Sequence, residues 1–391
     1  MIRRLLKPLA SLRLTVVLFA LSMFLIFAGT LAQVRDGVWT VVDQYFRSPF
    51  VLIDLQLFVP EKIAKIPGAI LFPGGFTLGI ALLINLIAAH AVRFKLRWKR
   101  MGIIITHLGV IFLLVGEFVT GLAAQEGKMT IIEGQSANYT EDIRTAELAI
   151  VDPSGSDDDL VVVVPQHLLT HPGSTIQDGL LPFKIHINEW MPNSQILGPN
   201  QTPPERKNLA NAGLASSLAA IPIPKATGVD GQSVDVPAAY ISLTHQDKPL
   251  GTYLVSVHLQ QPQTVIFDGQ AYQIELRFKR TYKPYTIHLI DFKHDLFTGT
   301  NKARNYSSQI RLVDEAKNVD REVLIYMNHP LRYAGETFYQ QSFLRGDTGT
   351  ILQVVKNPGW LIPYISCIMI TIGMLWHFGL RLAPTLRRKS S

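Results

Sequence analysis

Residues 101–134 read MGIIITHLGVIFLLVGEFVTGLAAQEGKMTIIEG, and the rest of the chain can be organised around them. The segment from Met101 to Leu122 is predominantly apolar and has the length of about 20 residues that an α-helix needs to cross the core of a bilayer. The residues that follow, Glu126 to Gly134, change to a pattern typical of a β-strand. This stretch therefore predicts a membrane-spanning helix that runs directly into a folded domain outside the membrane.

The charges around this helix predict its orientation. Basic residues precede it throughout the loop 93–100, RFKLRWKR. Because loops rich in Lys and Arg stay in the cytoplasm, the N-terminal end of the helix should be cytoplasmic. Basic runs also stand beside apolar segments at 1–7 and 381–389. The same rule places both termini in the cytoplasm and the large domain outside.

The composition indicates a membrane protein. With 391 residues, of which 48% are hydrophobic and 17% charged, the chain is more apolar than an ordinary soluble protein. The formal net charge of +7 comes from basic residues that flank apolar runs, so they signal topology and do not indicate a nucleic-acid partner. The only cysteine, Cys367, lies in an apolar run, which excludes a disulfide framework or a dithiol redox site.

These patterns predict the fold class and the domain organisation. We expect a membrane protein with four transmembrane α-helices and a large, mostly antiparallel β extracytoplasmic domain. In chain order the segments are a cytoplasmic N-terminus (1–13), the first span (14–32), an outer loop with a short interfacial segment at 49–60 (33–71), the second span (72–92), a basic cytoplasmic loop (93–100), the third span (101–122), the β-rich domain (123–357), the fourth span (358–380) and a cytoplasmic tail (381–391).

The outer domain contains short runs of alternating or β-branched residues, separated by turns rich in Pro, Gly, Asp and Asn. These runs predict an antiparallel sandwich or a barrel-like domain. The stretch 192–236, rich in Pro, Ala and Gly, interrupts the pattern and predicts a long mobile insertion. The predicted strands are 128–133, 160–164, 183–189, 238–244, 252–259, 272–278, 284–290, 309–313, 322–327 and 348–355.

Three histidines lie in the predicted spans. A neutral imidazole can stay uncharged in lipid and offers a nitrogen to a metal, so His107 suits haem ligation between helices. His107 could equally be a structural histidine that is hydrogen-bonded to a neighbouring helix. His90 and His377 fall at comparable depth in their spans. They either join His107 in one site or extend toward the interface.

Glu117 is the other ionisable residue of the third span, about 15 Å along the helix from His107. It could relay protons, pair with a basic group of another subunit, or pack as a protonated carboxyl between helices. The sequence leaves these three roles open.

The densest group of polar and aromatic residues in the outer domain lies near its C-terminal end. Aromatic rings and an arginine on adjacent turns could cradle a flat ligand or a partner peptide. They could also form the core and a corner of the β-domain. The residues are Asn328, Pro330, Leu331, Arg332, Tyr333, Gly335, Tyr339 and Gln340.

Several of these segments resemble the ResB-like (CcsB) family of cytochrome c biogenesis proteins. Residues 106–116, with 126–127 and 132–134, are similar to the third span of the family and the strand after it. Residues 289–312, with Asp291-Phe292, Gly299-Thr300 and Ser308, resemble its Asp-Phe…Gly-Thr…Ser block. Residues 328–343 resemble its signature near the end of the outer domain. The order of three early spans, an outer domain and a final span is also that of the family.

The resemblance implies a role in System II cytochrome c biogenesis, in a bacterial inner membrane or a thylakoid-type membrane. ResB-like proteins pair with a ResC/CcsA-type membrane protein in this pathway, which carries haem b across the membrane and attaches it to apocytochrome c. The family's intramembrane histidine is an axial haem ligand, and this role maps onto His107. His90 and His377 match no position of the family pattern and leave open a second ligand within this chain.

Two functions follow from these observations. The first is a haem-handling subunit of a System II cytochrome c synthase, which helps to bind and export haem and to present it for covalent attachment. The attachment site should lie mainly in the partner, because this chain lacks the tryptophan-rich haem-presenting segment. The second is an extracytoplasmic scaffold or assembly factor for a membrane complex, without haem of its own. Haem in the purified protein would separate them.

Overall fold

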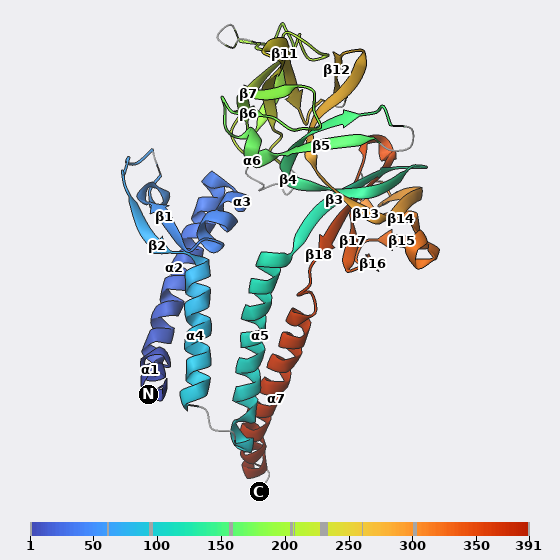
Figure 1. Cartoon of the computed structure of the whole chain (residues 1–391). Coiled ribbons are helices and arrows are strands. Elements are labelled where there is room, and N and C mark those ends of the chain that lie inside the picture. The colour runs from blue at the N-terminus through green and yellow to red at the C-terminus, as the bar shows by residue number, and fades with distance from the viewer. Residues whose placement is uncertain are drawn as a thin grey trace.

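The computed structural model describes residues 2–60, 62–93, 97–155, 159–203, 206, 208–226, 234–259, 261–299 and 303–389. Helices form one half of the molecule and strands the other (Figure 1). Thr300 and Lys95, which belong to the family-like block and the basic loop, lie outside the described residues.

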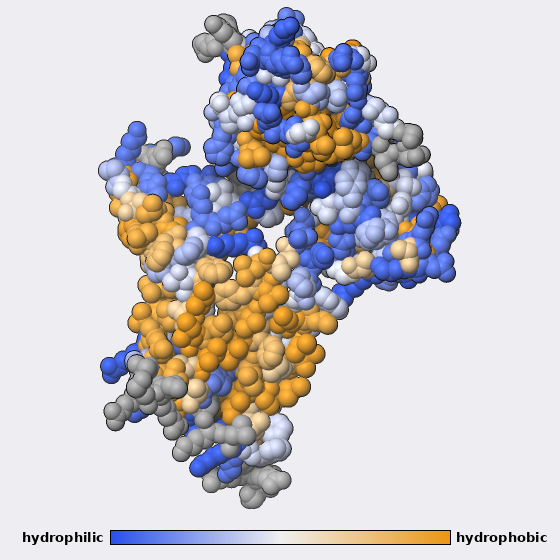
Figure 2. Space-filling view, viewed as in Figure 1, coloured by the Kyte–Doolittle hydropathy of each residue, from blue (hydrophilic) through white to orange (hydrophobic). Residues whose placement is uncertain are grey.

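Within that described part, four helices are long and apolar enough to cross a membrane. They are α2 (Leu12–Asp36), α4 (Gly75–Arg93), α5 (Met101–Ala123) with the short η3 (Trp98–Arg100) before it, and α7 (Ile362–Lys389). The short α1 (Ile2–Leu9) precedes them. Their outer surfaces form a hydrophobic zone, whereas the half of the molecule above it is largely hydrophilic (Figure 2).

The helices fall into two groups, with α1, α2 and α4 on one side and α5 and α7 on the other (Figure 1). The connection after α2 contains α3 (Val38–Val41), the π-helical η1 (Val42–Phe46), β1 (Phe50–Asp54), the 3-10 turn η2 (Leu55–Phe58) and β2 (Ala69–Pro73).

The predicted interfacial segment 49–60 is therefore largely a strand and a 3-10 turn. Strand β1 pairs with β2 from Phe50↔Pro73 to Asp54↔Ala69, so the second spanning helix begins at Gly75 and not at residue 72. The ring of Phe58 stacks on Phe24 and Phe27 of α2, with centroids 5.9 and 6.3 Å apart.

Helices α5 and α7 pack closely through a row of glycines. Gly102, Gly109 and Gly116 are buried and recur every seven residues on α5, which keeps them on one face. A Cβ at Gly102 would lie 2.6 Å from the backbone nitrogen of His377, and one at Gly109 would lie 2.9 Å from the carbonyl oxygen of Ser366. Only glycine allows the two backbones to approach so closely, as small residues do at other membrane helix interfaces.

The two strands joined to these helices continue the same pairing. Strand β3 (Gln125–Ile132) follows α5, and β18 (Gly349–Lys356) precedes α7. They pair antiparallel from Gln125↔Lys356 to Ile132↔Gly349. The helix pair and the strand pair therefore form one continuous unit from the Gly102 end of α5 into the β-domain.

The β-domain contains a ten-stranded and a four-stranded antiparallel sheet among the described residues. The larger sheet contains β3 and β18 together with β4 (Ser136–Asp152), β5 (Leu160–Pro165), β12 (Gln263–Phe267), β13 (Gln270–Leu296), β14 (Ala303–Asp314), β15 (Val319–Tyr326), β16 (Leu331–Tyr333) and β17 (Glu336–Phe343). The smaller sheet contains β6 (Thr175–Ile176), β7 (Lys184–Met191), β10 (Ala238–His245) and β11 (Lys248–Ser256). The predicted fold class is confirmed.

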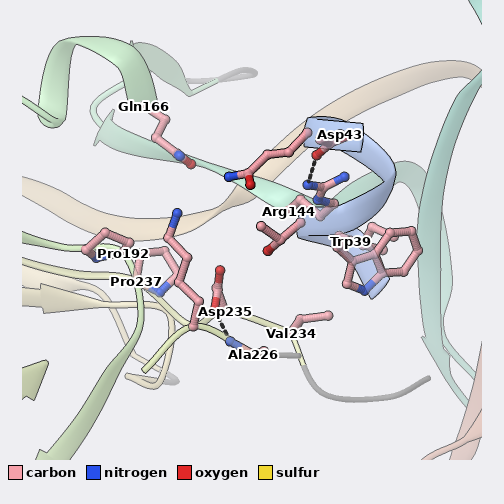
Figure 3. Close-up of a pocket in the computed structure, with 13 residues that line it drawn as sticks. Trp39, Asp43, Arg144, Gln166, Pro192, Ala226, Val234, Asp235 and Pro237 are labelled. Atoms are coloured by element: carbon pink, nitrogen blue, oxygen red, sulfur yellow. Dashed lines mark hydrogen bonds and ion pairs between the residues drawn. The ribbon is translucent and has the colours of Figure 1, made fainter. Parts of the chain in front are cut away.

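The connection after α2 contacts this domain through Arg144. The Nη2 atom of Arg144 lies 2.6 Å from the carboxylate of Asp43 on η1, and its guanidinium lies 5.3 Å from the ring centroid of Trp39 on α3. A cavity of about 300 Å³ lies beside this contact, with Gln166 of the one-turn helix α6 (Gln166–Leu169) and Asp235 on its other walls (Figure 3).

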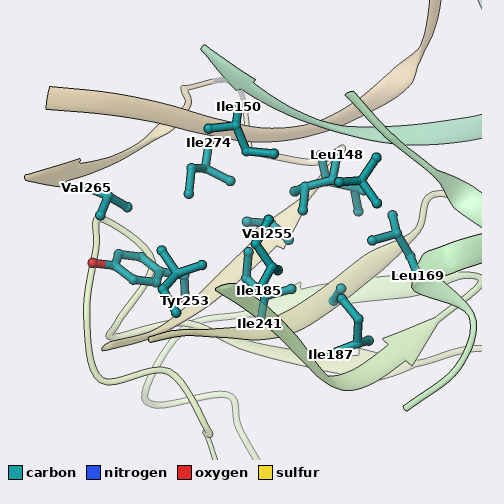
Figure 4. Packing of buried hydrophobic residues seen from close by; sticks show 14 of the residues in the cluster. Leu148, Ile150, Leu169, Ile185, Ile187, Ile241, Tyr253, Val255, Val265 and Ile274 are labelled. Atoms are coloured by element: carbon teal, nitrogen blue, oxygen red, sulfur yellow. The ribbon is translucent and has the colours of Figure 1, made fainter. Parts of the chain in front are cut away.

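Two large hydrophobic cores and a smaller one around Tyr240 stabilise the domain. The upper core contains Leu148, Ile185, Ile241 and Ile274, which point toward one another from both sheets (Figure 4). The lower core, nearer the helices, contains Met129, Ile131, Ile287, Leu289, Phe338 and Leu352. Strand β13 contributes to both, so its 27 residues connect the two parts.

Several predicted strands differ from the structure. Residues 272–278 and 284–290 belong to one strand, β13, whose register shifts near Pro284 without breaking the strand. Strands β4 and β17 were not predicted, because polar residues interrupt their alternation. In 192–236, the described residues are not an unpacked loop: β8 (Ser194–Leu197) pairs with β9 (Ala219–Pro222), and buried alanines there pack on Tyr240.

The glycine row predicts the effect of one added methyl group. Gly102→Ala should lower the thermal unfolding midpoint in detergent, because overpacking of a filled contact costs about 1–3 kcal/mol and the neighbouring atoms are backbone. Gly121→Ala is the matched control, since its Cβ would meet no atom within 4 Å. Equal midpoints for the two variants would contradict close α5–α7 packing.

A second prediction concerns the ion pair between the two cores. Nε of Arg277 lies 3.0 Å from Glu147, and the two side chains are 9% and 6% exposed. Arg277→Met should destabilise the domain by about 3–5 kcal/mol, since it leaves a buried carboxylate uncompensated. Arg311→Met breaks the pair with Asp320, whose side chains are both 52% exposed, and should cost less than about 1 kcal/mol. Chemical unfolding followed by circular dichroism measures both, and similar losses would refute the contrast.

Candidate functional site

Two of the three predicted histidines face each other between α4 and α5. The ring centroids of His90 and His107 are 5.2 Å apart, with planes at 84°, and both side chains are half-buried. Nδ1 of His90 lies 2.9 Å from the carbonyl oxygen of Leu86. Because a carbonyl can only accept, this bond puts the proton on Nδ1 and the lone pair of the neutral ring on Nε2. His90 is therefore held in the tautomer that a metal ligand needs.

The histidine pair lies on the facing sides of the two helices. On α5, His107, Leu114 and Phe118 are spaced by seven and four residues, which keeps them on one face. Phe118 contacts Phe76 of α4 edge to face, with centroids 5.1 Å apart. The two helices thus contact each other through histidines at one end and phenylalanines at the other.

An apolar pocket of about 200 Å³ lies at the phenylalanine end. Its walls are Phe46, Arg47, Gly75, Phe76, Gly79, Leu114, Glu117, Phe118, Gly121 and Leu122. Glu117 therefore faces the space between α4 and α5 and not the glycine contact with α7. We refer to the facing side chains, from His90 and His107 to this pocket, as the α4–α5 groove.

His377 does not join the histidine pair. Its backbone packs against Gly102, on the face of α5 that carries the glycine row, and its ring contacts Phe378 at 5.4 Å. The structure therefore brings together two of the three predicted ligands. In the described part of the chain, no three His, Cys, Asp or Glu side chains are grouped so that they could hold a metal ion.

The polar and aromatic group near residue 330 joins the β-domain to α7. The guanidinium of Arg332 lies 4.0 Å from the ring centroid of Trp360, just before α7 begins. Ala334 and Gly335 both have positive φ, 49° and 79°, as a two-residue turn between β16 and β17 requires. Asn328 also has a positive φ of 63°.

The other members of this group contribute to the lower core and its surface. Leu331, which follows Pro330, is buried there. Gln340 accepts a hydrogen bond from the Ser308 hydroxyl at 2.6 Å and donates one to the Thr350 hydroxyl at 3.0 Å. Tyr339 is 39% exposed and lines a cavity of about 520 Å³ beside Trp360. Most of these side chains thus serve packing and the join to α7.

Tyr333 donates a hydrogen bond to Asp314 at 2.6 Å, and Lys317 lies 3.2 Å from the same oxygen. The bond from Tyr333 lowers the pKa of Asp314 most; burial opposes it, and Lys317 adds to it. Since the folded pKa lies below the unfolded value of about 3.9, ionised Asp314 stabilises the fold above that pH and the contribution is lost as pH falls through the folded pKa.

Asp314→Asn should therefore lower the unfolding midpoint at pH 7, and the difference from the unchanged protein should shrink as the pH falls below about 4. Tyr333→Phe, which keeps the ring but removes the donor, should show part of the same pH dependence. Thermal unfolding between pH 7 and 3 measures both. A difference that stays constant over this range would contradict the role assigned to Asp314.

Sequence reasoning left the pairing of His90 with His107 open as one of two alternatives, and it missed the contact of Arg144 with Asp43. His90 and His107 lie on different helices, and Asp43 and Arg144 are 101 residues apart in the chain. None of these pairs has a spacing that a motif could have revealed.

The fold and the site define a class of protein: a membrane protein with four spanning helices, an antiparallel β-domain carried by the last two, and a histidine pair between α4 and α5. Residues 251–351 match the model of the ResB-like family. The match lies within the β-domain and includes β13 and the group near residue 330. The resemblance to the ResB-like family predicted from the sequence is confirmed over this part of the chain.

Two curated relatives extend the comparison. Protein NrfI of Wolinella succinogenes is 25% identical over 322 residues, which are 79% of this chain and 30% of NrfI. The cytochrome c biogenesis protein CcsB of a Picosynechococcus species is 29% identical over 110 residues, which are 28% of this chain and 23% of that protein. The chain therefore spans less than a third of the length of either relative.

Proposed function

We propose that this chain acts in cytochrome c biogenesis as a haem-handling membrane subunit, with His107 as an axial ligand of haem b in transit. The observation that supports this most is the His90–His107 pair, with ring centroids 5.2 Å apart between two spanning helices. We take the process, cytochrome c biogenesis, from the name of the relative CcsB.

The chemistry of the pair suits an iron porphyrin. Neutral imidazole is a common axial ligand, and the surroundings of α4 and α5 are apolar, as a porphyrin ring requires. His90 is held by Leu86 in the tautomer that a second ligand needs. We assign His90 as the second axial ligand within this chain. A histidine of a partner protein is the alternative second ligand.

The orientation follows from charge. Lys99 and Arg100 stand at the histidine end of α5, and Arg93 ends α4, whereas the β-domain follows the opposite end. By the positive-inside rule the histidine pair lies toward the cytoplasm and the β-domain outside, with both termini cytoplasmic. Haem would then enter near His107 and leave toward the β-domain.

Partners follow from the same proposal. The chain matches 30% of NrfI and 23% of CcsB, and the partner proposed for it is a ResC/CcsA-type membrane protein that attaches haem to apocytochrome c. The exposed apolar surface of α4 and α5, which includes Ile84, Ile87 and Phe112, is available to it or to lipid.

The test is the haem absorbance spectrum of the purified chain, alone and co-expressed with the partner. We expect bound haem, a loss of most of it in His107→Ala, and recovery with added imidazole. His377→Ala is the matched control and should leave the spectrum unchanged, since His377 lies on the other face of α5.

His90→Ala locates the second ligand. A shifted spectrum in the chain alone assigns it to His90, and a shift seen only with the partner's histidine replaced assigns it to the partner. A protein that never carries haem, yet still binds the partner, would overturn the proposal in favour of a scaffold.

A further inference from the structure

A cavity of about 520 Å³ lies where the β-domain meets the start of α7. The hairpin of β16 and β17 forms one wall of it, and the end of β18 forms a second. The third wall belongs to the last spanning helix and the turn before it, with Trp360, Pro363 and Tyr364. Because the apolar span begins at Ile362, the cavity lies at the level where a bilayer passes from hydrocarbon to headgroups.

The lining of the cavity contains an arginine whose charge is not neutralised. Arg332 of β16 is exposed, and its guanidinium lies 4.0 Å from the ring centroid of Trp360. Among the described residues, the guanidinium has neither a carboxylate nor a carbonyl oxygen as a partner. The contact with the ring uses the positive charge of Arg332 and leaves N–H groups available to an oxygen acceptor. Trp360 therefore orients a group whose planar fork matches a phosphate.

The acidic residue of the described lining, Glu336, is already neutralised within the chain. Nζ of Lys283 lies 2.6 Å from its carboxylate, and the two side chains are both 9% exposed. Glu336 also accepts a hydrogen bond from the hydroxyl of Tyr285. The charge of Arg332 is therefore left uncompensated, and the described lining offers no free carboxylate to an ammonium group.

Two tyrosines add hydroxyl donors beside the arginine. Tyr339 of β17 and Tyr364 of α7 both line the cavity and are 39% and 60% exposed. Neither hydroxyl bonds to another residue in the described part of the chain. Tyrosine and tryptophan are common at the membrane interface, where one end of the ring is apolar and the other is hydrated. One guanidinium and two hydroxyls thus face a cavity at this level.

An exposed apolar strip of α7 leads away from the cavity. Tyr364, Ile368 and Leu375 are at least 60% exposed, and their spacing of four and seven residues keeps them on one face of the helix. The contact with α5 is made by the other side of α7, at Ser366 and Ile370. The strip can therefore take the acyl chains of a molecule whose headgroup lies in the cavity.

We propose that this cavity binds the phosphate of an anionic phospholipid such as phosphatidylglycerol, with Arg332 as the phosphate-binding residue. The apolar strip favours a lipid over a soluble phosphate or an acidic protein segment, because neither of these would use it. The uncompensated charge of Arg332 favours an anionic headgroup over a zwitterionic one. This inference does not depend on haem binding.

The experiment is native mass spectrometry of the full chain, released from nanodiscs that contain equal amounts of phosphatidylglycerol and phosphatidylcholine with the same acyl chains. The unchanged protein should retain phosphatidylglycerol in preference. Arg332→Gln should lower that preference about fivefold, the effect of one basic residue at an anionic lipid surface. Arg332→Lys keeps the charge and should keep most of the preference.

Arg345→Gln is the matched control. Arg345 is exposed on η5 (Arg345–Asp347), which precedes β18, whereas α7 follows it. This change should leave lipid retention unaltered, and circular dichroism should show that all three variants are folded.

Equal retention of the two lipids by the unchanged protein would overturn the proposal, and this measurement needs no variant. A preference for phosphatidylglycerol that survives Arg332→Gln would also overturn it. Release of the bound lipid by millimolar inorganic phosphate would assign the cavity to a soluble anion and contradict a lipid site. Since no readout involves haem, failure here is distinguishable from failure of haem ligation by His107.

Discussion

The close contact between α5 and α7 is the constraint on which the rest of the structure depends. Gly102, Gly109 and Gly116 let the two backbones meet where any side chain would keep them apart. Strands β3 and β18 continue this pairing without a break, so the register of the helices and that of the central sheet are linked. The lower core is built on these strands, and the Arg332–Trp360 contact closes the domain onto the same unit.

This arrangement gives α5 two different faces. The glycine face is filled by α7 and has no room for a ligand, which explains why His377 is separated from His107. The opposite face carries His107 and Phe118 and meets α4 through side chains that do not interlock along their whole length, leaving a pocket between them. Helices α5 and α7 pack closely, whereas α4 and α5 leave a pocket between them. This arrangement suits the proposed function, in which a ligand enters and leaves between α4 and α5.

Much of this architecture could be predicted from the sequence, because a spanning helix depends on local hydropathy and charge. The apolar helix ending near Leu122 and the strand after it are examples. Features that depend on contacts between distant residues could not be predicted from the sequence. The apolar residues of β2 look like the start of a span until β1 pairs with them, and Pro284 looks like a strand end until β4 and β14 hold β13 continuous. The approach of His90 to His107 depends on packing alone.

The most direct test of this account is the position of iron in the haem-loaded chain, determined by cryo-electron microscopy in nanodiscs. The account predicts density for a porphyrin in the α4–α5 groove, with iron beside the ring of His107 and the α5–α7 contact unchanged. Iron bound near His377, or haem outside the helices with the groove closed, would contradict it.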